Sequence, residues 1–148
     1  MTVMIFDWGR TLHDPETDTL FRGVATLLQK LSPAYDLVLV SLAKSDSPEN
    51  RRERIAASGI AHHFKLILVG GEEKNELYEK ALETLGAAPR DVVVVDDQVL
   101  RGVRWGNQRG TRTIWLRNGK FARELPTQET GNPTFTITNI TEVASLPL

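Results

Sequence analysis

The sequence predicts an α/β fold in which helices cover both faces of a mainly parallel sheet of five to six strands. Two observations lead to this prediction. Short apolar runs alternate along the chain with stretches whose apolar residues recur at helical spacing, which is the pattern of a β-α repeat. The runs also lack alternating polar positions, and strands that are apolar on both sides belong in a sheet that is covered on both faces. The expected architecture is a three-layer α/β/α sandwich.

The apolar runs are the expected strands. Each run is too short for a helix and is bounded by turn residues. They lie at about 2–6, 37–40, 66–69, 92–95, 111–116 and 134–137. The last run is the shortest signal, which is why the expected number of strands is five to six.

The stretches between the runs are the expected helices. The first runs from about Leu20 to Ser32-Pro33, with Thr17 or Asp18 as its N-cap. Ser47-Pro48 opens the second, with Ser as cap and Pro at the first helical position. The others are expected at about 77–85, ending at Gly86, at 100–108, and as a last turn at 141–146. The segment 12–17 is expected to be a loop, and 120–132 resembles a linker.

The composition excludes several functional classes. With 148 residues, the chain has a common size for one domain, expected to span 1–148. Its net charge of −1 gives no electrostatic footprint for nucleic acid or an anionic membrane. The lack of cysteine excludes disulfides and thiolate chemistry and is compatible with a cytoplasmic location. We expect neither a signal peptide nor a membrane span.

Carboxylates stand directly after two of the expected strands. Asp7 follows the first strand, and Asp96 and Asp97 follow the run of four valines. The carboxyl ends of parallel strands meet at one edge of a sheet, where open α/β sheets bind their ligands. Adjacent carboxylates repel each other unless a cation lies between them, and oxygen ligands suit a hard cation. The sequence therefore predicts one hard-cation site at this edge.

Four short motifs, taken in order, resemble those of the haloacid dehalogenase (HAD) superfamily of phosphohydrolases. They lie at 6–12, at 38–41, at Lys74 and at 92–102. The resemblance extends from about residue 3 to residue 116, and its strength lies in the order of the motifs at strand ends. It implies a single Rossmann-like HAD domain and a phosphomonoester substrate.

The resemblance also implies a catalytic set. Asp7 is expected to be the nucleophile that accepts the phosphoryl group, since a carboxylate is ionised at neutral pH. Ser41 is expected to hold phosphate oxygens, and Lys74 to neutralise charge on the nucleophile and the phosphate. The substrate-binding residues expected around them are Trp8, Arg10, Thr11, Ser41 and Leu42.

Mg²⁺ is the cofactor that the resemblance implies. Its ligands are expected from Asp7, the backbone carbonyl of Gly9, and Asp97 or Asp96. Such an ion removes the repulsion between a carboxylate nucleophile and a phosphate.

Two positions depart from the family pattern. Gly9 stands where family phosphatases have a second Asp, which protonates the leaving group and then activates water, so hydrolysis should be slow. Gly102 stands where the fourth motif has an acidic residue, which removes an indirect metal ligand. His13 is either a substitute acid or a loop histidine, and Arg10 either points at phosphate or lies on the surface.

The spacing leaves no room for a cap domain, because one helix and one strand fill each interval from Asp7 to Ser41 and from Ser41 to Lys74. This argues against the phosphonate-cleaving and dehalogenase branches, which also lack the second Asp but depend on a cap. Capless members are associated with large substrates or use a second subunit as a lid, so a homo-oligomer is an open expectation. The rival to a slow phosphatase or phosphotransferase is a degenerate binding module for a phosphorylated partner or a metal.

Overall fold

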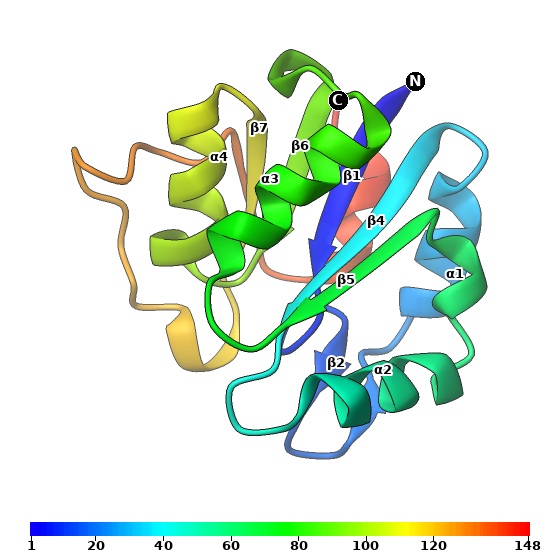
Figure 1. Cartoon of the computed structure of the whole chain (residues 1–148). Coiled ribbons are helices and arrows are strands. Elements are labelled where there is room, and N and C mark those ends of the chain that lie inside the picture. The colour runs from blue at the N-terminus through cyan, green and yellow to red at the C-terminus, as the bar shows by residue number, and fades with distance from the viewer.

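A six-stranded sheet forms the centre of the molecule in the computed structural model, which describes residues 1–148. Its spatial order is β5-β4-β1-β6-β7-β8 (Figure 1). The strands are β1 (Thr2–Asp7), β4 (Tyr35–Leu42), β5 (Leu66–Gly70), β6 (Val92–Asp96), β7 (Arg112–Leu116) and β8 (Phe135–Ile137). Every neighbouring pair is parallel, so the predicted α/β fold is confirmed and the sheet is wholly parallel.

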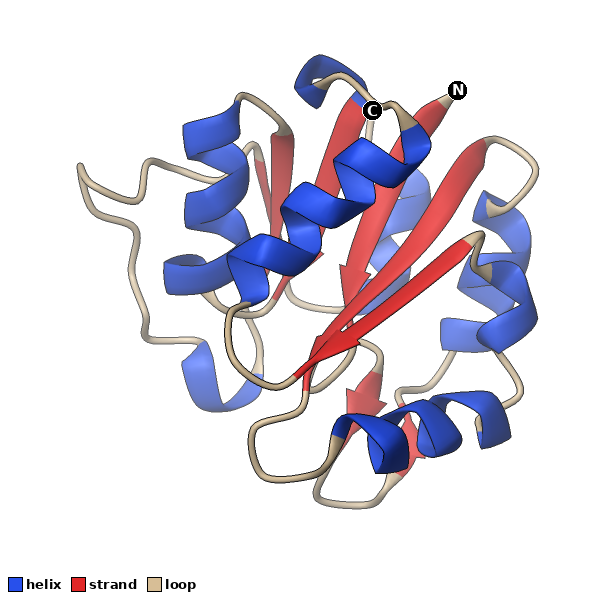
Figure 2. Cartoon of the chain, in the orientation of Figure 1, coloured by secondary structure: helices blue, strands red, loops and turns tan.

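Helical segments cover both faces of the sheet (Figure 2). The segments are α1 (Val24–Leu31), α2 (Pro48–Ala57), α3 (Lys74–Leu85), α4 (Arg104–Arg109) and the 3₁₀ segment Ile140–Ser145. Successive residues of β1 point to opposite faces. Met4 and Phe6 therefore pack in one core with α1, α2 and the 3₁₀ segment, whereas Val3 and Ile5 pack in the other with α3 and α4. None of the helices is long and apolar enough to cross a membrane.

Helix ends that carry strong capping residues lie where the sequence predicts them. The Ser47 hydroxyl accepts a hydrogen bond from the backbone N–H of Asn50, and Pro48 is the first residue of α2. Gly86 ends α3 in the left-handed conformation, with φ = 60°. Local sequence thus suffices to locate a helix end where a capping residue adjoins an amphipathic stretch.

The prediction for the segment before α1 was wrong. Leu20 belongs to a short strand, β3 (Thr19–Leu20), which pairs with β2 (His13–Asp14) in a two-stranded antiparallel hairpin. Helix α1 starts only after Gly23, whose φ of 87° interrupts any helix that would begin earlier. The spacing of apolar residues continues across this break, so periodicity placed the start too early.

The helix expected at 100–108 is two segments. A π-helical turn, Val99–Val103, precedes α4. The last helical turn is 3₁₀ rather than α, and begins with a capping box between Asn139 and Glu142. π-Turns often occur at functional sites, and this one directly follows the carboxylates at the end of β6.

Candidate active site

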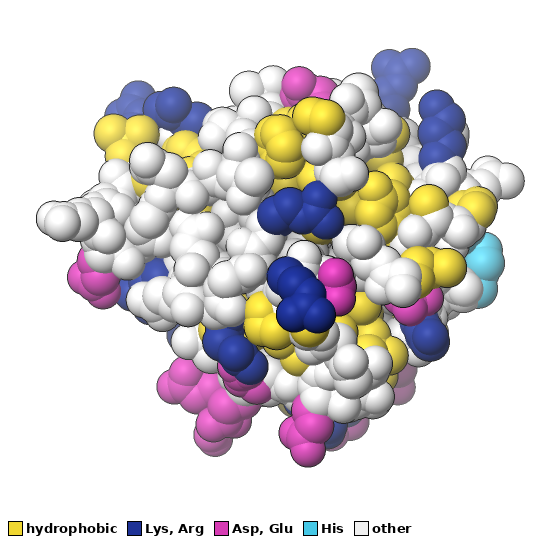
Figure 3. All heavy atoms as spheres, turned by 90° about the horizontal axis from the view of Figure 1, so that it is seen from above, with side chains coloured by type: hydrophobic (Ala, Val, Ile, Leu, Met, Phe, Trp, Pro, Cys, Tyr) yellow, Lys and Arg dark blue, Asp and Glu magenta, His cyan; other side chains and the backbone are white.

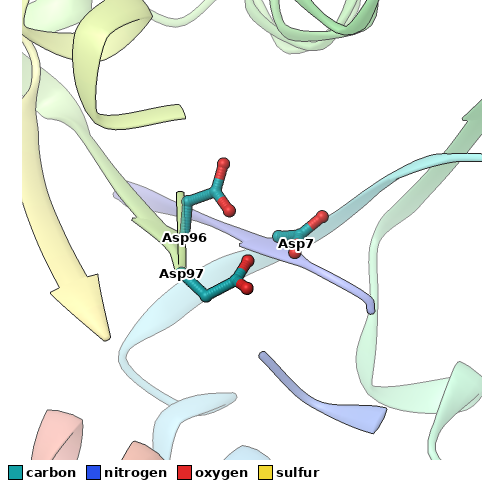
Figure 4. Close-up of side chains that lie close together, drawn as sticks. All are labelled: Asp7, Asp96 and Asp97. Atoms are coloured by element: carbon teal, nitrogen blue, oxygen red, sulfur yellow. The ribbon is translucent and has the colours of Figure 1, made fainter. Parts of the chain in front are cut away.

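Three acidic side chains converge at the carboxyl ends of β1 and β6 (Figure 4). Phe6 pairs with Val95 in the parallel register, which places Asp7 next to Asp96 and Asp97. One oxygen of each carboxylate lies within 4.8 Å of the others, and all three residues are buried. The sheet register therefore brings together the acids that the sequence placed at a common edge.

Lys74 links two of these acids. Its Nζ donates to Asp7 Oδ1 at 2.7 Å and to Asp96 Oδ2 at 3.0 Å. Burial alone would lower the pKa of the Lys74 ammonium, but Asp7 and Asp96 together hold this pKa well above its usual value. Lys74 is the first residue of α3, so the start of that helix places a positive charge next to Asp7.

The Asp96 carboxylate accepts four hydrogen bonds. Its Oδ2 accepts from Lys74, from the Tyr78 hydroxyl at 3.3 Å and from the Gly102 N–H at 2.8 Å, and its Oδ1 accepts from the Gln98 N–H. Burial raises the pKa of the Asp96 carboxyl, but Lys74 and these hydrogen bonds outweigh it and the pKa lies below its usual value. Asp96 is thus an ionised structural partner of Lys74.

Gly102 provides the space that Asp96 occupies. A Cβ at this position would lie 2.5 Å from Asp96 Oδ2 and 2.7 Å from the Tyr78 hydroxyl. From sequence alone, Gly102 was interpreted as the loss of a metal ligand. The structure adds a different reason for glycine there, because no side chain can be placed without displacing Asp96.

The Asp97 carboxylate, in contrast to that of Asp96, accepts no hydrogen bond. Both of its carboxylate oxygens are buried and have no hydrogen-bond partner. Burial, together with the charges of Asp7 and Asp96, raises the pKa of Asp97 to about 10. Burial also raises the pKa of Asp7, against the opposing effect of Lys74. Three carboxylates facing one ammonium fit a hard divalent cation, which would supply the missing positive charge and a partner for Asp97.

A pocket of about 330 Å³ opens above Asp7 and Lys74. The predicted site residues Gly9, Arg10, Ser41 and Leu42 line it. Thr11 does not reach the pocket, because it is fully buried and its hydroxyl donates to Asp7 Oδ2 at 3.1 Å.

Trp8 and His13 lie beside this pocket and do not line it. Their rings stack with centroids 5.1 Å apart, and Trp8 packs in the main core. His13 Nε2 lies 2.9 Å from Asp18 Oδ1. Both residues line an adjoining hollow instead. This hollow shares Gly9, Pro15 and Arg51 with the pocket above Asp7, so Trp8 and His13 lie next to that pocket rather than in its lining.

Sequence reasoning missed several basic residues that line the pocket. Arg51 Nη1 donates to the Ser41 hydroxyl at 2.7 Å, which ties α2 to β4. Burial lowers the pKa of the Arg51 guanidinium, while Asp46 and Asp7 oppose that effect. Further cationic side chains come from Lys44, Arg101 and Lys120. In the sequence these residues look like solvated charges, and only the closure of the fold brings them together.

Comparisons with known proteins agree with the fold and the motifs. Residues 69–143 match the model of the HAD-hydrolase-like family. The chain is 32% identical to phosphoserine phosphatase of Thermus thermophilus, over 54% of this chain and 34% of that protein. It is 25% identical to N-acylneuraminate-9-phosphatase of Rattus norvegicus, over 86% of this chain and 52% of that protein. The chain thus spans about a third to a half of the length of these curated relatives.

Solved structures share the fold at low identity. An uncharacterized protein from Listeria monocytogenes superposes with a TM-score of 0.80 at 18% identity, over 98% of this chain and 96% of that one. L-2-haloacid dehalogenase from Xanthobacter autotrophicus gives 0.69 at 15% identity, over 86% and 60%. With the family match and the ordered strand-end residues, these findings show that the chain belongs to the HAD-hydrolase-like family of the HAD superfamily of hydrolases.

Proposed function

We propose that this protein is a phosphohydrolase or phosphotransferase that acts on a phosphomonoester through an aspartyl-phosphate on Asp7, with Mg²⁺. The observation that carries the proposal is the Asp7 carboxylate at the base of a cationic pocket, bonded to Lys74 at 2.7 Å and next to the unpartnered Asp97. The relatives' names support the substrate class, since the two compared here are both phosphatases.

The metal ligands we propose are Asp7, Asp97 and the backbone carbonyl of Gly9. Sequence reasoning left Asp96 and Asp97 open, and the hydrogen bonds favour Asp97, because Asp96 is already occupied by Lys74 and its other donors. Bound Mg²⁺ would neutralise part of the negative charge that the carboxylate and the phosphate share.

The chain's own residues account for the transfer step. A carboxylate oxygen of Asp7 attacks phosphorus, and the bond from phosphorus to the leaving oxygen breaks. Lys74 and the Ser41 hydroxyl, which Arg51 orients, hold the phosphoryl oxygens. Water then attacks the acyl phosphate, which releases inorganic phosphate and regenerates Asp7.

Hydrolysis should be slow because no side chain stands at Gly9 to move the proton. General acid–base catalysis contributes about 10²–10⁴-fold. His13 is not placed to replace it, since it is paired with Asp18 and lies outside the pocket.

The direct test is turnover of an aryl phosphate with Mg²⁺ by Asp7→Asn. The amide cannot act as the nucleophile, so turnover should fall to background. Asp36→Asn is the matched control, because Asp36 is paired with Lys65 at the start of β4. Undiminished activity in Asp7→Asn would refute the mechanism.

The second candidate is a binding module for a phosphorylated partner or a metal. The observation that favours it is the absence of a side chain at Gly9 within an otherwise cationic pocket. This reading expects phosphate esters to bind in the presence of Mg²⁺ with no product formed, even in a single-turnover experiment.

A further inference from the structure

The pocket above Asp7 collects more positive charge than one phosphoryl group needs. Its lining contains six basic residues, Arg10, Lys44, Arg51, Lys74, Arg101 and Lys120, and a single acid, Asp7. The chain as a whole carries a net charge of −1, so this concentration is local. Figure 3 shows the face opposite the carboxyl ends of the strands, where basic, acidic and apolar side chains are interspersed.

Five of these six cations have no ion-pair partner. Lys74 is paired with Asp7 and Asp96, whereas the ion pairs elsewhere involve other basic residues. Acids do lie nearby, since Glu72, Glu73 and Glu124 line a neighbouring hollow with Lys44 and Arg101. None of the three pairs with them, and Glu124 instead accepts from the Leu100 N–H. The five cations are therefore available to a ligand.

These five cations fall into an inner and an outer set. Arg51 belongs to the inner set, because it is bonded to Ser41. We place Arg10 in the same set, because it lies in the loop after β1, three residues after Asp7. Lys44, Arg101 and Lys120, which we call the outer basic group, come from the segments after β4, β6 and β7 (Figure 1). Three separate chain segments thus bring positive charge to one pocket.

Local structure fixes the backbone of Arg10 and the side chain of Arg101. Arg10 has φ = 64°, a left-handed conformation that favours glycine, and the HAD pattern has glycine there. Its N–H is bonded to the His13 carbonyl at 2.7 Å. Arg101 lies in the π-helical turn, and its Nε donates to Gln98 Oε1 at 3.0 Å. The left-handed backbone of Arg10 is strained, and such strain is typical of functional sites.

We propose that the substrate is a small phosphomonoester with a second anionic group, a phosphate or a carboxylate, which the outer basic group binds. The inference rests on the proposed function for the group that is transferred. The volume of about 330 Å³ is that of a small-molecule site. Leu42, Phe121 and Pro15 are the apolar residues among the 14 that line it, so most of the lining residues are polar or charged. The proposed substrate is small, whereas the resemblance to capless family members led us to expect a large one.

The test uses three phosphate esters with one carbon frame: 3-hydroxypropyl phosphate, 3-phosphooxypropanoate and propane-1,3-diyl bisphosphate. The measured quantity is kcat/KM with Mg²⁺ at constant ionic strength. We expect the natural protein to prefer the two esters with an anionic tail by about 10- to 100-fold, as charge-assisted hydrogen bonds imply. The carboxylate and bisphosphate arms show which second anion is preferred.

The double variant Arg101→Gln/Lys120→Gln should reduce this preference towards one, mainly by raising KM for the anionic-tail esters. Lys30→Gln is the matched control, because Lys30 is exposed on α1 and does not line the pocket. An equal kcat/KM for all three esters, or a preference that the double variant keeps, would overturn the inference. So would a preference for an acidic phosphopeptide over all three.

Binding by calorimetry separates this inference from the proposed function. Turnover without a tail preference contradicts the second anion site and leaves the phosphatase intact. Tail-dependent binding without turnover, reduced by Arg101→Gln/Lys120→Gln, supports the second anion site and contradicts the phosphatase. The absence of both turnover and tail-dependent binding contradicts both.

Discussion

Asp96 and Asp97 are neighbours in sequence but have opposite surroundings. Asp96 is the last residue of β6 and Asp97 is the first residue beyond it, and both side chains lie on the side of Asp7 (Figure 4). The Asp96 carboxylate accepts hydrogen bonds from Lys74, Tyr78 and the Gly102 N–H, whereas the Asp97 carboxylate has no hydrogen-bond partner. The Asp96 carboxylate positions Lys74, whereas no group of the chain compensates a negative charge on the Asp97 carboxylate.

Asp97→Asn tests whether a bound cation compensates the charge of Asp97. The natural protein should gain thermal stability in millimolar Mg²⁺, because a ligand that binds only the folded state stabilises it. The variant should lose this gain, since the amide carries no charge, without losing stability in the absence of metal. Thermal unfolding with and without Mg²⁺ measures both, with Asp36→Asn as control. If Asp97→Asn kept the full Mg²⁺-dependent gain in stability, Asp97 would not be a ligand of the proposed metal site.

Gly102→Ala tests the space around Asp96. The new methyl group would meet Asp96 Oδ2 and the Tyr78 hydroxyl at well below contact distance, so we expect a loss of about 1–3 kcal/mol in the free energy of unfolding. Gly9→Ala is the control, because a Cβ there meets nothing within 4 Å. Urea unfolding measures the difference. Equal stabilities would show that Asp96 can move at no cost.

At the scale of elements, the strands and the capped helices could be predicted from the sequence, and the hairpin β2–β3 could not. Apolar runs and cap residues act locally, as at Ser47-Pro48 and Gly86. The hairpin depends instead on pairing between His13 and Leu20, and its two-residue strands are too short for any periodicity. The π-helical turn is equally invisible, because no residue pattern marks it.

Ser47→Ala tests whether α2 positions the residues that we propose to bind phosphate. Loss of the cap should cost about 1 kcal/mol of stability. Because α2 carries Arg51 to the Ser41 hydroxyl, KM for an aryl phosphate should also rise. Ser32→Ala is the control, since its hydroxyl makes only a 3.4 Å contact at the end of α1. An unchanged KM would mean that Arg51 reaches Ser41 independently of the helix start.

At the scale of the whole molecule, the strand order explains where the site lies. The chain passes from β1 to β4 and β5 on one side and then to β6 on the other, so the connections after β1 and β6 lead in opposite directions from this central pair. Ligands bind at such switch points in open α/β sheets. Asp7, Ser41 and Asp97 could be predicted there because each follows or ends a recognisable strand.

The basic lining of the pocket could not be predicted in the same way. Lys44 and Lys120 stand in loops, where a charged residue has the same local pattern whether it faces solvent or a pocket. Their convergence depends on the strand order, which the sequence alone does not specify. For the same reason, the bond between Arg51 and Ser41 appears only once α2 has packed beside β4.

The most direct test of the account compares the natural protein, Gly9→Asp and the double variant Asp7→Asn/Gly9→Asp. The Gly9 position accepts a side chain, since its φ is not positive and a Cβ has open space. If the nucleophile and the metal site are intact and only the proton-transfer group is missing, Gly9→Asp should hydrolyse an aryl phosphate about 10²–10⁴-fold faster with Mg²⁺. The double variant should then be inactive. No acceleration in Gly9→Asp, or activity that survives without Asp7, would contradict the account.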